Sequence, residues 1–178
     1  MTIFYSKNKT EFLVPKEGKI LDCSFSDLFQ KVRFRNESKE VLIPKTTLYV
    51  RDALGWTKLS KIKVVENQIE PLKLITNNKC IYTTTTILIP VYTNKIIRGF
   101  HGEIKYACNF KSIDEISDDD LIMFFDYDND KICQLSQFKI EKYLFKIQNI
   151  ENQKFTDVWF EIQTASEFFN LNGIQLHV

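Results

Sequence analysis

The stretch VWFEIQTASEFFNLNGIQLHV, residues 158–178, has the pattern of two strands joined by a tight turn. Two phenylalanines precede the dipeptide Asn172-Gly173, and an apolar stretch that includes His177 follows it. Asn-Gly between apolar runs is a strong hairpin signal, because both residues tolerate a positive φ. Chain ends are usually polar and frayed. A hydrophobic hairpin at this end therefore predicts a strand built into the centre of the fold.

Strand signals also dominate the rest of the chain. Segments rich in β-branched and aromatic residues alternate with short polar turns, and they read TKLSKIKVVE, PLKLIT, CIYTTTTILIPVYT, KIIRGF and EIKYACNF. The threonine run is interpreted as ordinary strand. QLSQFKIEKYLFKIQNIE favours a long half-buried strand or bent hairpin, with a helix over residues 134–146 as the alternative.

Helix signals are few. SFSDLFQKV has Ser24 or Ser26 as its candidate N-cap, and one turn is expected at Ser112, with Glu115 completing a capping box. Many short strands with little helix predict an all-β fold.

The composition excludes several classes of protein. The 178 residues are 44% hydrophobic with 15 Phe, enough to fill the core of one domain. The net charge of +1 gives no sign of a nucleic-acid partner. MTIFYSKNKTEFLV is not a signal peptide and no apolar run is long enough to cross a membrane, so we expect a cytoplasmic protein. Abundant Lys, Asn, Ile and Phe suggest an A/T-rich gene, as in a phage or an A/T-rich bacterium. If a phage encodes the protein, the expected location is the host cytoplasm or a virion.

No metal or cofactor site is expected. The four cysteines are far apart, without a CxxC pair, and favour reduced structural thiols over a zinc site. Asp126, Asp128 and Asp130 have the spacing of a calcium loop but lack its glycine and closing carboxylate, which favours a solvated turn. SDDDL is interpreted as an acidic turn that enters a strand, and His101 as a turn residue without a role.

The order of these segments resembles the Hint superfamily, the fold of inteins and hedgehog autoprocessing domains. The segments similar to its successive blocks are PKTTLYVRDALGWTKLSKI, KLITNNKCIYTTTTILIPVYTN, ACNFKSIDEISDDDLIMFF and VWFEIQTASEFFNLNGIQLHV. The resemblance covers residues 41–178 and implies a horseshoe of β hairpins with pseudo-two-fold symmetry. Residues 1–40 are then expected to form an N-terminal β arm or extension.

The chemistry of that family implies roles for a few residues. In the family a first Cys or Ser attacks its own preceding carbonyl, a Thr-x-x-His motif acts on that amide, and a terminal Asn cyclises beside a penultimate His. Aligned on these motifs, the chain keeps Thr84 and His177. Leu42, Ile87 and Val178 stand in the positions of the nucleophile, the motif histidine and the asparagine. The resemblance thus implies a degenerate site.

Three functions stay open. The chain is a silent intein-like domain serving as a structural or interaction module, an autoprocessing domain that uses Cys23 to release an N-terminal segment, or an unrelated all-β binding module. The sequence ends with the Hint-like region, so no downstream segment is expected for ligation. On the first hypothesis the chain is not an enzyme. A protein partner or a second copy is then expected to bind through residues 1–40, by strand addition.

Overall fold

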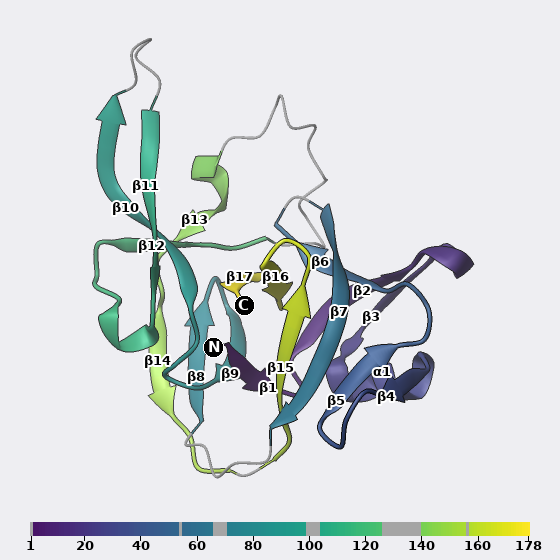
Figure 1. The fold of residues 1–178 in the computed structure, drawn as a ribbon. Helices are drawn as coiled ribbons and strands as arrows, with labels where there is room; N and C mark the ends of the chain where they lie inside the picture. Colours follow the sequence, from purple (N-terminus) through teal and green to yellow (C-terminus); the bar gives the residue numbers. More distant parts are fainter. Residues whose placement is uncertain (1, 54, 66–70, 99–103, 126–139, 156) are drawn as a thin grey trace.

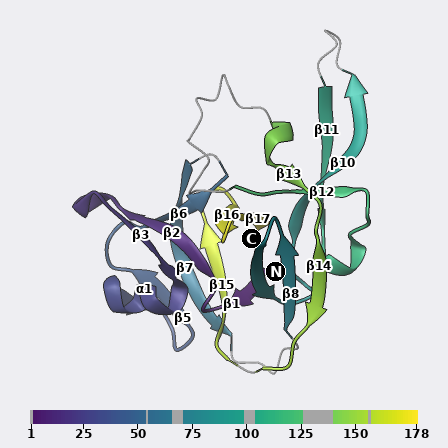
Figure 2. The same ribbon diagram turned by 180° about the vertical axis from the view of Figure 1, so that it is seen from behind.

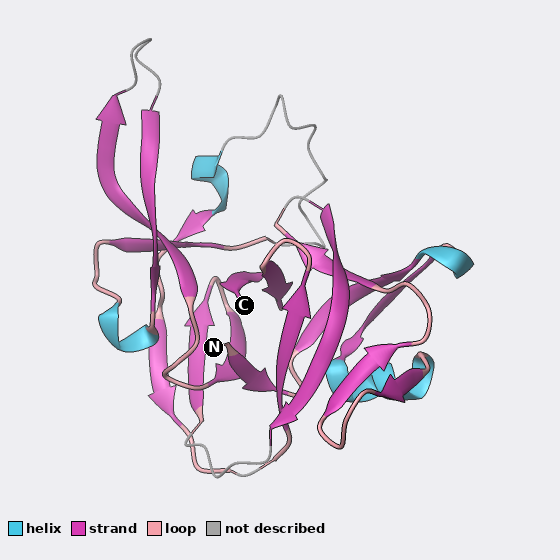
Figure 3. Cartoon of the chain, viewed as in Figure 1, coloured by secondary structure: helices cyan, strands magenta, loops and turns pink. Residues whose placement is uncertain are grey.

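The computed structural model describes residues 2–53, 55–65, 71–98, 104–125, 140–155 and 157–178. Strands account for most of these residues, as the sequence predicts (Figure 3). Helix is limited to α1 (Phe25–Lys31) and to the short 3-10 turns η1 (Pro15–Glu17), η2 (Ile113–Glu115) and η4 (Ile140–Tyr143) in the described part.

One eleven-stranded sheet forms the body of the molecule (Figure 1). Its strands are β1 (Ile3–Tyr5), β2 (Lys9–Val14), β3 (Lys19–Ser24), β4 (Phe34–Asn36), β5 (Val41–Pro44), β6 (Tyr49–Asp52), β7 (Gly55–Val65), β8 (Leu72–Thr76), β9 (Lys79–Thr83), β14 (Asn149–Asn152) and β15 (Trp159–Thr164). The main path runs β14-β8-β9-β1-β15-β7-β6-β2-β3, and β5 joins β4 to β7.

Two smaller sheets complete the fold. The four-stranded sheet has the order β11-β10-β12-β13. Its strands are β10 (Ile89–Arg98), β11 (Ile104–Lys111), β12 (Asp120–Met123) and β13 (Leu144–Phe145). The third sheet is the hairpin of β16 (Phe168–Leu171) and β17 (Ile174–His177). In both views this hairpin lies in the middle of the molecule, close to the N-terminus (Figures 1 and 2).

The terminal hairpin has the conformation that its sequence predicts. Asn172 and Gly173 both have positive φ, at 47° and 96°, as the tight turn requires. The Asn170 side chain accepts from the Gly173 N–H at 2.9 Å and donates to the Gly173 carbonyl at 2.8 Å. Phe169 and Leu176 face each other across the hairpin and are fully buried. The turn therefore positions the buried side chains of Phe169 and Leu176 in the core.

The first strand lies inside the sheet rather than at its edge. β1 pairs with β15, with Ile3 opposite Glu161, and with β9 through Phe4 and Thr83. Phe4 is fully buried and packs 4.8 Å from the ring of Phe25 and 5.2 Å from that of Phe169. The first forty residues thus share one sheet and one core with the rest of the chain. The division at residue 40 stays a prediction.

Both helix signals are confirmed. Ser24 is the N-cap of α1, and its hydroxyl accepts from the Asp27 N–H at 3.1 Å. In η2 the Glu115 carboxylate accepts from both the N–H and the hydroxyl of Ser112, each at 3.0 Å. A tight hairpin joins β6 to β7, with Asp52 opposite Gly55.

The interpretation of the threonine run as strand holds for Thr83 and is wrong for the three threonines that follow it. β9 ends at Thr83, and a turn follows in which the Ile87 N–H donates to the Thr84 carbonyl at 3.3 Å. The hydroxyls of Thr84 and Thr86 are hydrogen-bonded at 2.9 Å. The turn bond engages the Thr84 carbonyl locally instead of in a strand ladder, a break that β propensity alone does not predict.

The long strand predicted from QLSQFKIEKYLFKIQNIE is also wrong for the part of that segment from residue 140 onward. The chain there forms η4, β13 and β14, which belong to different sheets: Phe145 pairs with Ile122, and Ile150 with Leu74. A segment that crosses between two sheets must break its ladder. The earlier part of this segment, His101, Cys133 and the three aspartates of the calcium-like spacing lie outside the described residues.

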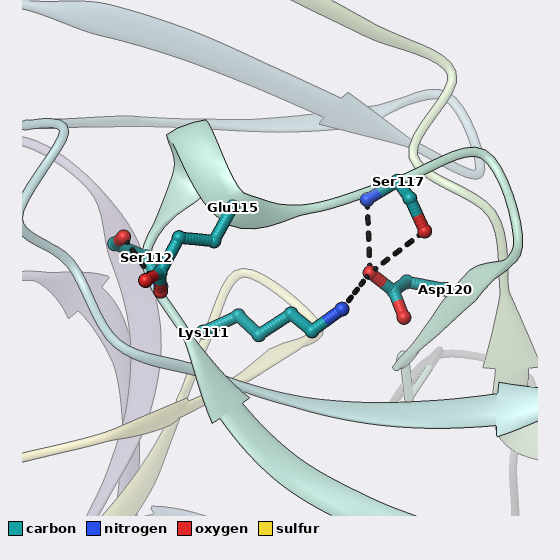
Figure 4. A network of polar contacts seen from close by, with 5 residues as sticks. All are labelled: Lys111, Ser112, Glu115, Ser117 and Asp120. Carbon is teal, nitrogen blue, oxygen red and sulfur yellow. Dashed lines mark hydrogen bonds and ion pairs between the residues drawn. The ribbon is translucent and has the colours of Figure 1, made fainter.

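SDDDL forms the predicted turn into β12, and its last aspartate, Asp120, is fixed by hydrogen bonds (Figure 4). The Asp120 Oδ2 accepts from Lys111 Nζ at 2.7 Å and from the N–H and hydroxyl of Ser117 at 2.9 and 3.2 Å. Burial raises the pKa of Asp120, but these bonds together outweigh it and hold the pKa below its ordinary value of 3.8. The carboxylate thus has a structural role.

Replacing Asp120 with asparagine should lower the free energy of unfolding by about 1–3 kcal/mol at neutral pH, since Lys111 loses its counter-charge. A depressed folded pKa stabilises above the unfolded pKa and is lost as pH falls through the folded value. The gap between wild type and Asp120→Asn should therefore close below about pH 3.8 in urea unfolding. Asp119→Asn, at an exposed neighbour, is the control; a gap that persists in acid would contradict the assignment.

Candidate functional site

Three segments distant in sequence meet near the two ends of the chain. The His177 N–H donates to the Leu88 carbonyl at 3.0 Å, and the two residues form an antiparallel bridge. Thr2 lies beside them: its hydroxyl donates to the His177 carbonyl and accepts from the Leu88 N–H at 3.4 Å. Thr2 is buried. The site thus joins the residue before β1, the turn after β9, and β17.

Aromatic rings hold the imidazole of His177. Phe110 stacks on it with 4.3 Å between ring centroids, and Phe168 meets it edge-on at 5.2 Å. The Nδ1 of His177 is buried and has no hydrogen-bond partner among the described residues. Phe110, about half exposed, forms the outer side of this cluster. The imidazole is therefore oriented by ring packing.

Thr84 and Ile87, which align with the Thr-x-x-His motif, lie between β9 and β10, just before Leu88 in the sequence. Thr84 is buried, and its hydroxyl is shared with Thr86. Ile87 is fully buried within the main hydrophobic core. At the position where the resemblance implies a second imidazole, this chain therefore has an alkyl side chain that packs in the core.

The other predicted site residues are spread over the molecule. Leu42 lies on β5, half-buried, opposite Ile62 of β7. Cys23 lies on β3, opposite Thr10, and burial raises the pKa of its thiol. In the sheet path, β15, β7, β6 and β2 separate β3 from β1. Among the described residues, no hydrogen bond or ring contact joins Cys23 or Leu42 to His177.

Two residues next to the site in sequence or space remain, Val178 and Thr2. The Val178 N–H donates to the Glu167 carbonyl at 2.9 Å, which fixes the backbone directly after His177. Thr2 was not predicted as a site residue. The sign of Thr2 in the sequence is a hydroxyl residue directly before the short apolar stretch IFY. This stretch lies near one end of the sequence, and the apolar stretch with His177 lies near the other.

No protein-family model and no curated protein sequence matches the chain. Solved structures do match. An intein from a hyperthermophile has a TM-score of 0.68 at 14% identity, over 100% of both chains. The TvoVMA intein has a TM-score of 0.67 at 12% identity, over 98% of this chain and 97% of that one. The transcription factor IIB Mvu mini-intein has a TM-score of 0.64 at 13% identity, over 100% of both chains.

The chain has the intein fold. The prediction of an all-β Hint architecture is thereby confirmed, and the similarity extends over the first forty residues as well as residues 41–178. At identities of 12–14% the likeness is one of fold, and chemistry must be argued from the side chains present. No described helix is long and apolar enough to cross a membrane.

Proposed function

We propose that this intein-fold domain has lost protein-splicing chemistry and serves as a structural or interaction module. The observation that carries the proposal is the chemistry of the residues that align with the family's reacting groups. Ile87 and Val178 occupy the positions of the motif histidine and the terminal asparagine, and Ile87 is packed into the core. An alkyl side chain can neither transfer a proton nor attack a carbonyl, so two steps of the reaction lack their reacting group.

The hydroxyl groups at the site do not replace what is missing. The Thr2 hydroxyl donates a hydrogen bond to the His177 carbonyl, and the Thr84 hydroxyl is hydrogen-bonded to that of Thr86. A hydroxyl without an adjacent general base is a weak nucleophile. The A/T-rich character of the composition supports a phage as its source.

The proposal predicts a chain that stays intact. The chain, of 21.0 kDa without tags, is expressed with a tag at each end and held for days with and without thiol. It should run on a denaturing gel as a single band at the mass of the tagged chain. Fragments that increase with time, and faster with thiol, would overturn the proposal. The same gel should include the variant Cys23→Ala, because loss of fragments in that variant would assign the nucleophile to Cys23.

A further inference from the structure

Two adjoining grooves flank the segment of residues 31–33, where α1 leads into β4. The hairpin of β2 and β3 forms one side of the first groove, and α1 with β5 lines the second. Both grooves share Lys31, Val32, Arg33 and Lys45. This side of the molecule carries β2, β3, α1, β4 and β5 in both views and lies away from the ribbon of β10 and β11 (Figures 1 and 2).

The grooves concentrate positive charge. Their rims carry the exposed cations Lys19, Lys31, Arg33 and Lys45, against one carboxylate, Glu17. Among the described residues, none of the four cations forms an ion pair. In a chain whose net charge is only +1, four cations around one surface favour an anionic ligand.

The floor of the grooves is apolar. Val14, Leu21 and Val32 are buried at the base of the first groove. Phe29, Phe34 and Leu42 line the second and are half-buried. Ligands that fit such a surface carry apolar side chains as well as negative charge.

An unpaired strand edge borders the same surface. β3 ends the path of the large sheet, and no described strand pairs with its outer edge. Ile20 on this strand has 55% of its surface exposed. An open strand edge beside a groove is the arrangement that extended peptides bind, through main-chain hydrogen bonds along the edge and side chains in the groove.

We propose that this surface binds an acidic, extended peptide segment of a partner protein, with at least one apolar side chain seated on the groove floor. The proposal rests on the interaction role proposed above and names the partner's chemistry. A single-stranded nucleic acid fits less well, because its bases are bound by stacking on exposed aromatic faces. Phe29 and Phe34 pack edge-to-face at 4.9 Å and are half-buried, so their faces are not presented for stacking.

The test uses the full chain and a peptide of about twelve residues that alternates Glu or Asp with Leu or Val. Fluorescence anisotropy should give saturable binding that weakens as salt rises from about 0.05 to 0.3 M. In a ¹⁵N-labelled sample the amide shift changes should centre on Leu21, Val32 and Leu42. A peptide of equal length with Gln and Asn in place of the acids should bind at least ~10-fold more weakly.

Charge-reversing variants localise the interaction. Lys31→Glu with Arg33→Glu and Lys45→Glu should weaken peptide binding at least ~10-fold. The matched control reverses three exposed lysines elsewhere, Lys58, Lys142 and Lys154, and should stay within about twofold of wild type. The amide shift map of the unmodified chain decides the location if the triple variant does not fold.

Three results would overturn the proposal: no saturable binding below about 1 mM, shift changes centred elsewhere, or tighter binding to a single-stranded oligonucleotide of equal charge. Each sample is also run on a denaturing gel. An intact chain that fails to bind the peptide overturns this inference alone, whereas a self-cleaved chain overturns the proposed function.

Discussion

Replacing Gly173 with alanine is expected to lower the free energy of unfolding by about 3 kcal/mol or more. The backbone φ of +96° disfavours any L side chain. A Cβ there would also lie 2.3 Å from the Phe124 ring and 2.8 Å from the Phe125 carbonyl oxygen. The ring cannot retreat, because Phe124 is itself buried in the core. Since domains of this size are stable by only about 5–15 kcal/mol, much of the margin should be lost.

Gly18→Ala is the matched control for this prediction. Gly18 also has a positive φ, +59°, but a Cβ there would meet nothing within 4 Å. Its cost should be limited to the left-handed backbone, about 1–2 kcal/mol. Urea unfolding of both variants measures the difference. Equal losses would show that the close approach to Phe124 contributes nothing and that φ alone requires glycine.

Changing Val178 to asparagine in a chain extended by a C-terminal tag is expected to restore cleavage after residue 178. The new carboxamide nitrogen would attack the carbonyl of its own residue, forming a succinimide and releasing the tag as a free amine. The framework for this step is in place, because His177 is held by Phe110 and its backbone is paired with Leu88. Tag release on a denaturing gel, with intact mass of both products, is the measurement.

Two controls show whether the restored cleavage uses this site. Val178→Ala with the same tag should stay intact, because it lacks the attacking nitrogen. Adding His177→Gln to Val178→Asn should slow release by about 100-fold or more, the usual contribution of a general acid or base. If Val178→Asn stays intact, or is cleaved equally fast without the imidazole, residue 178 does not correspond to the family's asparagine.

The sequence predicts best where a short pattern determines its own conformation. The Asn172-Gly173 turn and the Ser24 cap are local features, and both are present as expected. The all-β architecture also follows from patterns that each strand carries alone. His177 was singled out because the resemblance gives it a position relative to the Asn172-Gly173 turn, which comes directly before β17; its role as a site residue stays a prediction.

Features that depend on distant partners were predicted less well. β9 pairs with β1 and β8 only as far as Thr83, and nothing in the run of four threonines indicates this limit, since threonine has high β propensity. Thr2 belongs to the site only because β1 is placed between β9 and β15. Its contact with His177 joins residues at opposite ends of the chain, and no periodicity within one segment carries that information.

The position of β1 also determines the order in which the molecule can assemble. Ile3 pairs with Glu161, so β1 must wait until the much later strand β15 has been synthesised before its ladder can close. Such long-range pairing slows folding, because the entropy of a large loop is lost before any contact compensates for it. Until then, Phe4 and the edges of β9 and β15 stay uncovered. Folding during synthesis should therefore complete late, and a chain stalled before β15 should be prone to aggregation.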